Sequence, residues 1–164
     1  EVGAIAERRV DRLLDITRSR DLPAFLTPDA GVNSGLMIAQ YTAAGIVAEN
    51  RRLAGPASVD SLPTSGMQED HVSMGWAACR KLRTVLDNLT SLLAVELVAA
   101  VRGLQLRAPL LPSPAGRVAI ELVSQFAGEP GPDIFLAPVL EAARAAVAGT
   151  ELRTAIEREV GSLA

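Results

Sequence analysis

The sequence predicts an all-α protein, a bundle of long helices, on three observations. Hydrophobic residues make up 49% of the 164 residues but aromatic residues only 3%, so Ala, Leu and Val must supply most of the buried surface. Such a composition, together with abundant Glu and Arg, favours helices over sheets. Apolar residues recur at steps of three and four, and one such stretch runs without a proline over residues 70–107. The chain is long enough for one domain with a substantial core.

The N-terminal third predicts two helices separated by a break. Residues 1–19 carry one apolar stripe. Because their first residues already resemble helix interior, we expect the chain to be cut from a longer one. Residues 20–32, which contain two prolines, break the pattern. The second helix should start near Asn33 or Ser34, both good caps, and end at residues 49–52. Its middle is apolar on nearly all sides, which is typical of a helix surrounded by others or lying in an interface.

A turn-rich loop and a very long helix follow. Residues 54–69 contain small, uncharged polar residues until their end, which predicts a buried or site-forming loop. The helix over residues 70–107 would span about 50 Å and is too long for this chain to cover alone, so we expect a bundle shared with missing chain or other subunits. We divide the chain into a central bundle segment, residues 1–107, and a C-terminal segment, residues 108–164. The shorter C-terminal helices are expected at residues 115–127, 134–148 and 150–161.

Charge and cysteine content exclude several classes of function. The net charge is −3, which argues against a nucleic-acid surface and against binding to anionic membranes. The longest apolar run, residues 92–101, is shorter than the roughly 20 residues that span a bilayer. A single cysteine permits no intrachain disulfide, and no cluster of Cys and His has the spacing of metal ligands. We therefore expect a cytoplasmic protein without a metal site.

Four adjacent polar residues, Gln68, Glu69, Asp70 and His71, mark the point where the loop becomes the long helix. Spacing alone favours a structural interpretation, in which Asp70 caps the helix and Glu69 lies favourably at the positive end of its dipole. A role for His71, the only histidine, as a base is less favoured than a structural one. The alternative is a catalytic or binding cluster.

Three other residues could carry chemistry, but each has a structural explanation that we favour. Glu96 lies in an apolar stretch, where a carboxylate needs partners, and we expect a salt bridge to an Arg of another helix. Tyr41 should pack in the core with its hydroxyl bonded. Cys79 should be inert packing within the long helix.

Three stretches of the sequence resemble the histidine ammonia-lyases of the aromatic amino acid lyase family. They are residues 33–40 (Asn-Ser-Gly-Leu-Met-Ile-Ala-Gln), 54–65 (Ala-Gly-Pro-Ala-Ser-Val-Asp-Ser-Leu-Pro-Thr-Ser) and 68–75 (Gln-Glu-Asp-His-Val-Ser-Met-Gly). The resemblance is close over residues 1–107 and looser beyond. It implies the C-terminal part of a fold of long packed helices, a homotetramer whose active sites combine several subunits, and elimination of ammonia from L-histidine to give urocanate.

The resemblance also implies an electrophile, a methylidene-imidazolone group formed from an internal Ala-Ser-Gly tripeptide. This sequence contains no Ala-Ser-Gly. In the family the tripeptide lies upstream of the matched segment, so this chain should lack the cofactor and should be inactive alone.

The resemblance assigns one substrate-facing residue to this chain, Glu69. Phenylalanine and tyrosine lyases usually have Gln at this place. A carboxylate can accept a hydrogen bond from an imidazole N–H, whereas a charge buried against a phenyl ring would be costly. With the resemblance, we therefore favour a Glu69 that binds the imidazole or takes part in proton transfer, with Gln68, Asp70 and His71 fixing the loop. Gly55 and the pair Gly66-Met67 depart from the common family residues, His and Ala-Asn.

Three hypotheses follow. The chain is a fragment of a histidine ammonia-lyase; or it belongs to a lyase or aminomutase for another amino acid; or it is a non-enzymatic helical assembly module derived from the lyase fold.

Overall fold

The structure, a computed structural model, describes residues 1–59 and 61–163, and the regular secondary structure of these residues consists of helices. Asp60, in the predicted loop, and Ala164, in the predicted C-terminal segment, lie outside the described residues. No strand occurs among the described residues, which confirms the all-α class. The helices are α1 (Val2–Leu14), α2 (Met37–Leu53), α3 (Gly75–Gln105), α4 (Pro114–Ala127), α5 (Ala137–Ala148) and α6 (Glu151–Val160), with short 3-10 turns η1 (Ala24–Leu26) and η2 (Ser65–Met67).

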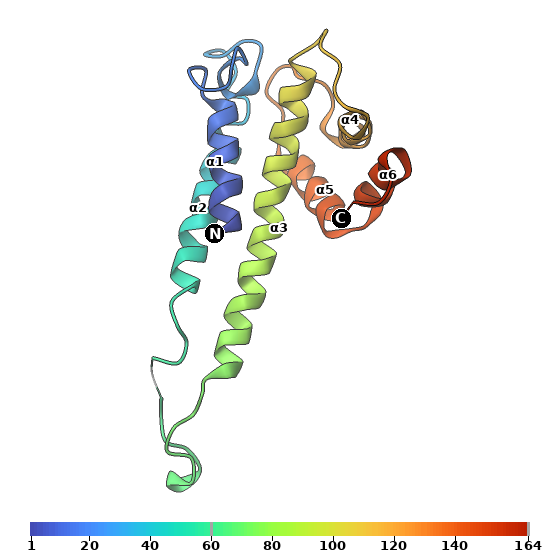
Figure 1. Cartoon of the computed structure of the whole chain (residues 1–164). Helices are drawn as coiled ribbons and strands as arrows, with labels where there is room; N and C mark the ends of the chain where they lie inside the picture. Colours follow the sequence, from blue (N-terminus) through green and yellow to red (C-terminus); the bar gives the residue numbers. More distant parts are fainter. Residues whose placement is uncertain (60, 164) are drawn as a thin grey trace.

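Helix α3 is the element on which most of the others pack. Helices α1 and α2 lie along one side of α3, and α4 and α5 pack against its C-terminal half on the other side (Figure 1). Helix α6 packs on α4 and α5. The first turns of α3 and the loop that connects it to α2 extend beyond the other helices (Figure 1). The first turns of this long helix expose Trp76, Leu82 and Leu86, and a bundle shared with further polypeptide stays a prediction.

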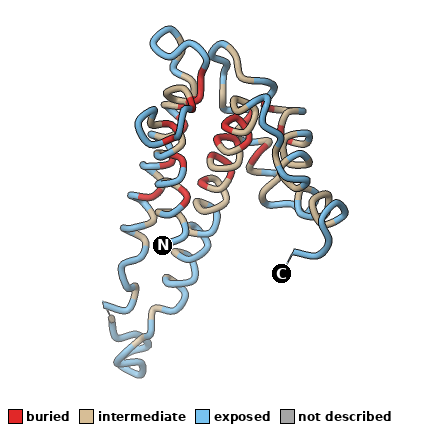
Figure 2. Tube along the Cα trace, turned by 45° about the horizontal axis from the view of Figure 1, so that its top comes forward, coloured by how far each residue is buried: buried red, intermediate tan, exposed pale blue. Residues whose placement is uncertain are grey.

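The core surrounds the C-terminal part of α3, between α1 and α2 on one side and α4 and α5 on the other. Figure 2 shows the buried residues gathered there, whereas the far ends of α2 and α3 are exposed. On α1 the buried residues are Ala6, Val10 and Leu14, at steps of four, so the helical period produces the buried face. Other fully buried apolar side chains come from every side of the bundle: Leu26, Leu36, Ala43, Leu92, Val98, Val123 and Ala143.

Helix α3 is also long and apolar enough to cross a membrane, with a mean hydropathy of 1.6 over an 18-residue window. The expectation that no apolar stretch reaches that length therefore does not hold for the whole helix. The core helix of a soluble protein meets the same criterion. Because α1, α2, α4 and α5 pack on α3, the apolar residues of its C-terminal part, from Leu92 on, belong to the core of this fold. Trp76, Leu82 and Leu86, by contrast, are exposed.

Two of the predicted helix starts are wrong. Asp70 does not cap α3, which begins at Gly75 after Met74, a residue with a left-handed φ of 54°. Neither Asn33 nor Ser34 caps α2, which follows Leu36 without a side-chain cap. A polar side chain at a position suited to capping can instead bond to other nearby backbone groups. Here the chain forms turns before the first residue of each of these helices.

Glu96 forms the predicted salt bridge. Its Oε1 accepts a hydrogen bond from Nη1 of Arg9 on α1 at 2.9 Å, while its side chain is only 16% exposed. The predictions for the other two residues are wrong. Tyr41 is 70% exposed on α2 and so does not pack in the core. Cys79 lies in α3 as expected, but it is an exposed free thiol and not a packed one.

Candidate functional site

The four predicted site residues lie in the loop between α2 and α3. The loop folds back on itself like a hairpin that two contacts hold closed. Farther from the tip, Ser61 Oγ accepts a hydrogen bond from Val72 N at 2.8 Å and donates one to Val72 O at 3.2 Å. Nearer the tip, Thr64 N donates to Glu69 O at 2.9 Å and Glu69 N donates to Thr64 O at 3.3 Å. The backbone of Glu69 is therefore fixed although its side chain is free.

The tip of the loop is a left-handed turn. Ser65, Gly66 and Met67 have φ of 54°, 62° and 71°. Left-handed backbone suits Gly66, but each of the other two residues costs about 1–2 kcal/mol in this conformation. Strain of this kind persists only where the surroundings determine it, and it is common in ligand-binding loops. The turn thus brings the chain sharply back to Gln68 and Glu69.

Gln68, Glu69, Asp70 and His71 are all exposed at this end of the molecule. Within residues 1–59 and 61–163, their side chains form neither hydrogen bonds nor salt bridges with the protein. The interpretation of the loop as buried is therefore wrong for this chain, while its role in forming a site stays a prediction. The loop carries further exposed apolar residues, Leu62 and Met67, both 67% exposed.

An exposed carboxylate alone is a poor recognition group for a ring. In water, the interaction energy between two unit charges 4 Å apart is only about 1 kcal/mol. The same pair interacts several times more strongly where solvent is partly excluded. Glu69 can accept a hydrogen bond from a cationic or neutral N–H, but selectivity for one ligand over another requires surrounding protein surface that excludes water. The described part of this chain supplies the carboxylate and its fixed backbone, but it leaves the side chain of Glu69 open to solvent.

Sequence analysis missed a second polar constellation, at the opposite end of α2. The Asp133 carboxylate accepts hydrogen bonds from the backbone N–H of Ser34 at 2.7 Å and of Gly35 at 2.8 Å. Asn33 Oδ1 in turn accepts a hydrogen bond from Asp133 N at 2.9 Å. These contacts tie the segment before α5 to the segment before α2. The Gly-Pro-Asp sequence indicates a turn, but nothing local reveals a partner a hundred residues away.

Neighbouring donors and a nearby cation stabilise the ionised carboxylate of Asp133. The backbone N–H groups of Ser34 and Gly35 lower the pKa of its carboxyl, and Arg102 adds a smaller effect of the same sign. Burial lowers the pKa of the Arg102 guanidinium, and the charge of Asp133 offsets part of that cost. The contact therefore stabilises the fold as long as Asp133 is ionised.

We expect Asp133→Asn to lower the melting temperature of the chain near neutral pH. The folded pKa lies below the ordinary 3.8, so the contribution is complete above that pH and disappears as the pH falls below it. The difference in melting temperature between wild type and variant should be largest at about pH 6 and shrink at about pH 3. Asp87→Asn, an exposed carboxylate on α3, serves as control and should show little difference at either pH. A difference that is constant with pH would contradict this assignment.

The fold and the sequence together define the class of protein. Residues 1–125 match the family "Aromatic amino acid lyase", and the chain belongs to this family. Similar solved structures agree: histidine ammonia-lyase from Trypanosoma cruzi has a TM-score of 0.90 at 37% identity over 96% of this chain. Tyrosine aminomutase from Streptomyces globisporus has a TM-score of 0.89 at 39% identity over 96% of this chain. The chain covers 31% and 30% of those two structures.

Similar curated relatives are histidine ammonia-lyases. The enzyme of Streptomyces avermitilis is 59% identical over 165 residues, which cover all of this chain and 32% of the relative. The enzyme of Streptomyces coelicolor is 58% identical over 164 residues, with 99% of this chain and 32% of the relative covered. The chain thus spans about a third of the length of the curated relatives it matches.

Proposed function

We propose that this chain is a segment of a histidine ammonia-lyase that eliminates ammonia from L-histidine to give urocanate. The observation that carries the proposal is the identity of 58–59% with histidine ammonia-lyases over essentially the whole chain. In this reaction the Cα–N bond breaks, a proton leaves the neighbouring carbon, and ammonia and urocanate are released. We further propose that the parent is a cytoplasmic homotetramer.

We propose that Glu69 faces the imidazole of the substrate. Its carboxylate would accept a hydrogen bond from the ring N–H and favour the cationic ring. Two features support this role: the backbone bridge to Thr64 fixes the position of Glu69, and its side chain forms no bond within the described chain that substrate would have to break. The role of Gln68, Asp70 and His71 in fixing the loop would depend on neighbours from the rest of the parent, since their side chains bond nothing within the described residues.

The electrophile of the family does not fit the residues of this chain. A methylidene-imidazolone forms from Ala-Ser-Gly, and here the Ser-Gly pairs follow Asn33 and Thr64. The backbone N–H groups of the first pair, Ser34 and Gly35, are bound by Asp133, and the second pair lies on the exposed tip of the loop. No step of the reaction is therefore assigned to such a group within this chain, and in the proposed parent it would come from other residues.

The isolated chain should be inactive. We expect the purified 164 residues, incubated with L-histidine, to produce no urocanate absorbance above that of buffer, because the chain holds an exposed carboxylate and no electrophile. A histidine ammonia-lyase of full length is the positive control. Urocanate formed at a rate proportional to the concentration of the isolated chain would refute this part of the proposal.

One structural observation favours a second candidate function. The tyrosine aminomutase of Streptomyces globisporus matches the chain as closely in fold and identity as does the histidine ammonia-lyase of Trypanosoma cruzi. An aminomutase would return the amino group to the neighbouring carbon and release a β-amino acid. The identity of product, an unsaturated acid or a β-amino acid, distinguishes the two candidates.

A further inference from the structure

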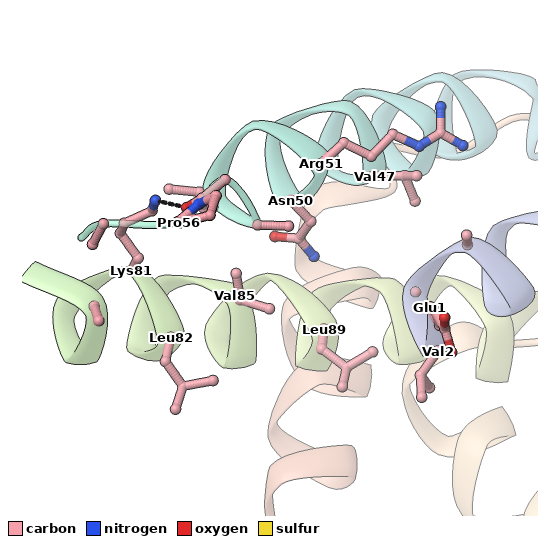
Figure 3. Close-up of a pocket in the computed structure, with 17 residues that line it drawn as sticks. Glu1, Val2, Val47, Asn50, Arg51, Pro56, Lys81, Leu82, Val85 and Leu89 are labelled. Atoms are coloured by element: carbon pink, nitrogen blue, oxygen red, sulfur yellow. Dashed lines mark hydrogen bonds between the residues drawn. The ribbon is translucent and has the colours of Figure 1, made fainter. Parts of the chain in front are cut away.

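An apolar groove opens beside the N-terminus of α1. It lies between the C-terminal turns of α2 and the N-terminal half of α3, has a volume of about 730 Å³, and is lined mostly by apolar atoms (Figure 3). Val47 lines it from α2, and Leu82, Val85 and Leu89 line it from α3. The first four residues of the chain form its end.

The wall that α3 contributes has the pattern of a helix-packing seam. Ala78, Leu82, Val85, Leu89 and Leu92 follow one another at alternating steps of four and three, the spacing at which one helix packs along another. Leu92, the last of these, is buried, with 1% of its surface exposed. Leu82 is 57% exposed, so the seam continues beyond the part that is covered.

Helix α1 covers the upper end of this seam. It approaches α3 so closely there that a Cβ added at Gly3 would lie 2.8 Å from Leu92 Cδ1. Its axis points along the groove, toward Leu89, Val85 and Lys81 (Figure 3). A helix continued backward from Glu1 would therefore lie in the groove.

We propose that the groove holds a helical extension of α1, formed by about 14 residues that precede Glu1 in the proposed parent, the number that matches the α3 seam between Ala78 and Leu92 at equal rise. The similar histidine ammonia-lyases are about three times as long as this chain, so a parent of that length has residues beyond these 164. The extension carries an apolar stripe in phase with Val2, Ala6 and Val10. An acidic residue in its first turn, near Lys81, balances both that cation and the helix dipole.

A labelling experiment tests this proposal, which depends on the proposed function only for the existence of a longer parent. Val85→Cys is introduced in a Cys79→Ser background, into this chain and into the same chain extended by the 14 residues that its gene encodes before Glu1. Maleimide should label the Cys of the 164-residue chain readily and label the extended protein at least about tenfold more slowly, because labelling then requires the groove to open. Leu86→Cys, at a position 53% exposed and absent from the groove lining, should react equally in both proteins.

Hydrogen exchange answers the same question without any substitution. Backbone amides of residues 78–89 should exchange more slowly in the extended protein than in this chain. Equal labelling of the Val85→Cys variants with equal exchange would overturn the proposal, as would a gene with no codons before Glu1. A second copy of the chain is the competing occupant. If labelling slows as the concentration of the 164-residue chain rises and light scattering shows a dimer, a second copy occupies the groove. That result would overturn the proposed extension of α1.

Discussion

In the full-length parent, Glu69→Gln should lower kcat/KM for L-histidine by about ten- to a hundredfold, the value of one hydrogen bond to a charged group. Glutamine keeps the size of the side chain and one acceptor oxygen but removes the negative charge that stabilises a cationic imidazole. The loss should be specific to histidine, because a phenyl ring has no N–H to donate and no positive charge for the carboxylate to stabilise. Steady-state rates of urocanate formation measure the effect.

Two controls separate recognition from folding. Asp87→Asn removes a carboxylate from the exposed face of α3 and should leave histidine kinetics unchanged. Circular dichroism and the subunit assembly of the Glu69→Gln parent should match the wild type, because the Glu69 side chain bonds nothing within the described residues. If Glu69→Gln left kcat/KM for histidine unaltered, Glu69 would have no part in recognition.

Leu92→Ala should destabilise this chain by about 2–5 kcal/mol, the usual cost of a large-to-small substitution in a packed core. Leu92 is 1% exposed and packs against α1 at Gly3, where an added Cβ would lie 2.8 Å from Leu92 Cδ1. Alanine would leave a cavity that the glycine opposite cannot fill. Urea denaturation followed by circular dichroism gives the change in the free energy of unfolding.

Leu86→Ala is the matched control on the same helix. Leu86 is 53% exposed, so its truncation should change the free energy of unfolding by less than about 0.5 kcal/mol. Both substitutions replace the same side chain and raise helix propensity equally. A similar loss for the two variants would mean that α3 does not have the buried and exposed faces described above.

Sequence predicted the helices well because their signal is local. The periodicity of apolar residues in α1 and α3 can be read directly from neighbouring positions. That Glu96 pairs with an arginine follows from the cost of an unpaired carboxylate, although only the structure identifies Arg9 as the partner. Tyr41 and Cys79 were misplaced because burial depends on what packs against a helix face, which the sequence does not contain. The Asp133 contact was missed for the same reason, since it joins segments a hundred residues apart.

For the candidate site, the sequence provided the residue but not the geometry. Glu69 was selected by resemblance and chemistry, and spacing alone favoured a cap at Asp70 instead. The left-handed turn at residues 65–67 and the bridge to Thr64 follow from backbone conformation, and two of the three turn residues give no glycine-like signal. The exposure of the loop could not be predicted, because exposure depends on what packs against the loop, and local sequence does not contain that information.

The most direct test of the central claim is the substrate preference of the full-length parent. L-Histidine and L-tyrosine are offered separately, and the products are identified by chromatography. We expect urocanate from histidine, with kcat/KM exceeding that for tyrosine by more than about a hundredfold, since the neutral phenol ring offers Glu69 neither a ring N–H nor a positive charge to stabilise. Equal or higher kcat/KM for tyrosine, or a β-amino acid as product, would contradict the assignment to histidine ammonia-lyase.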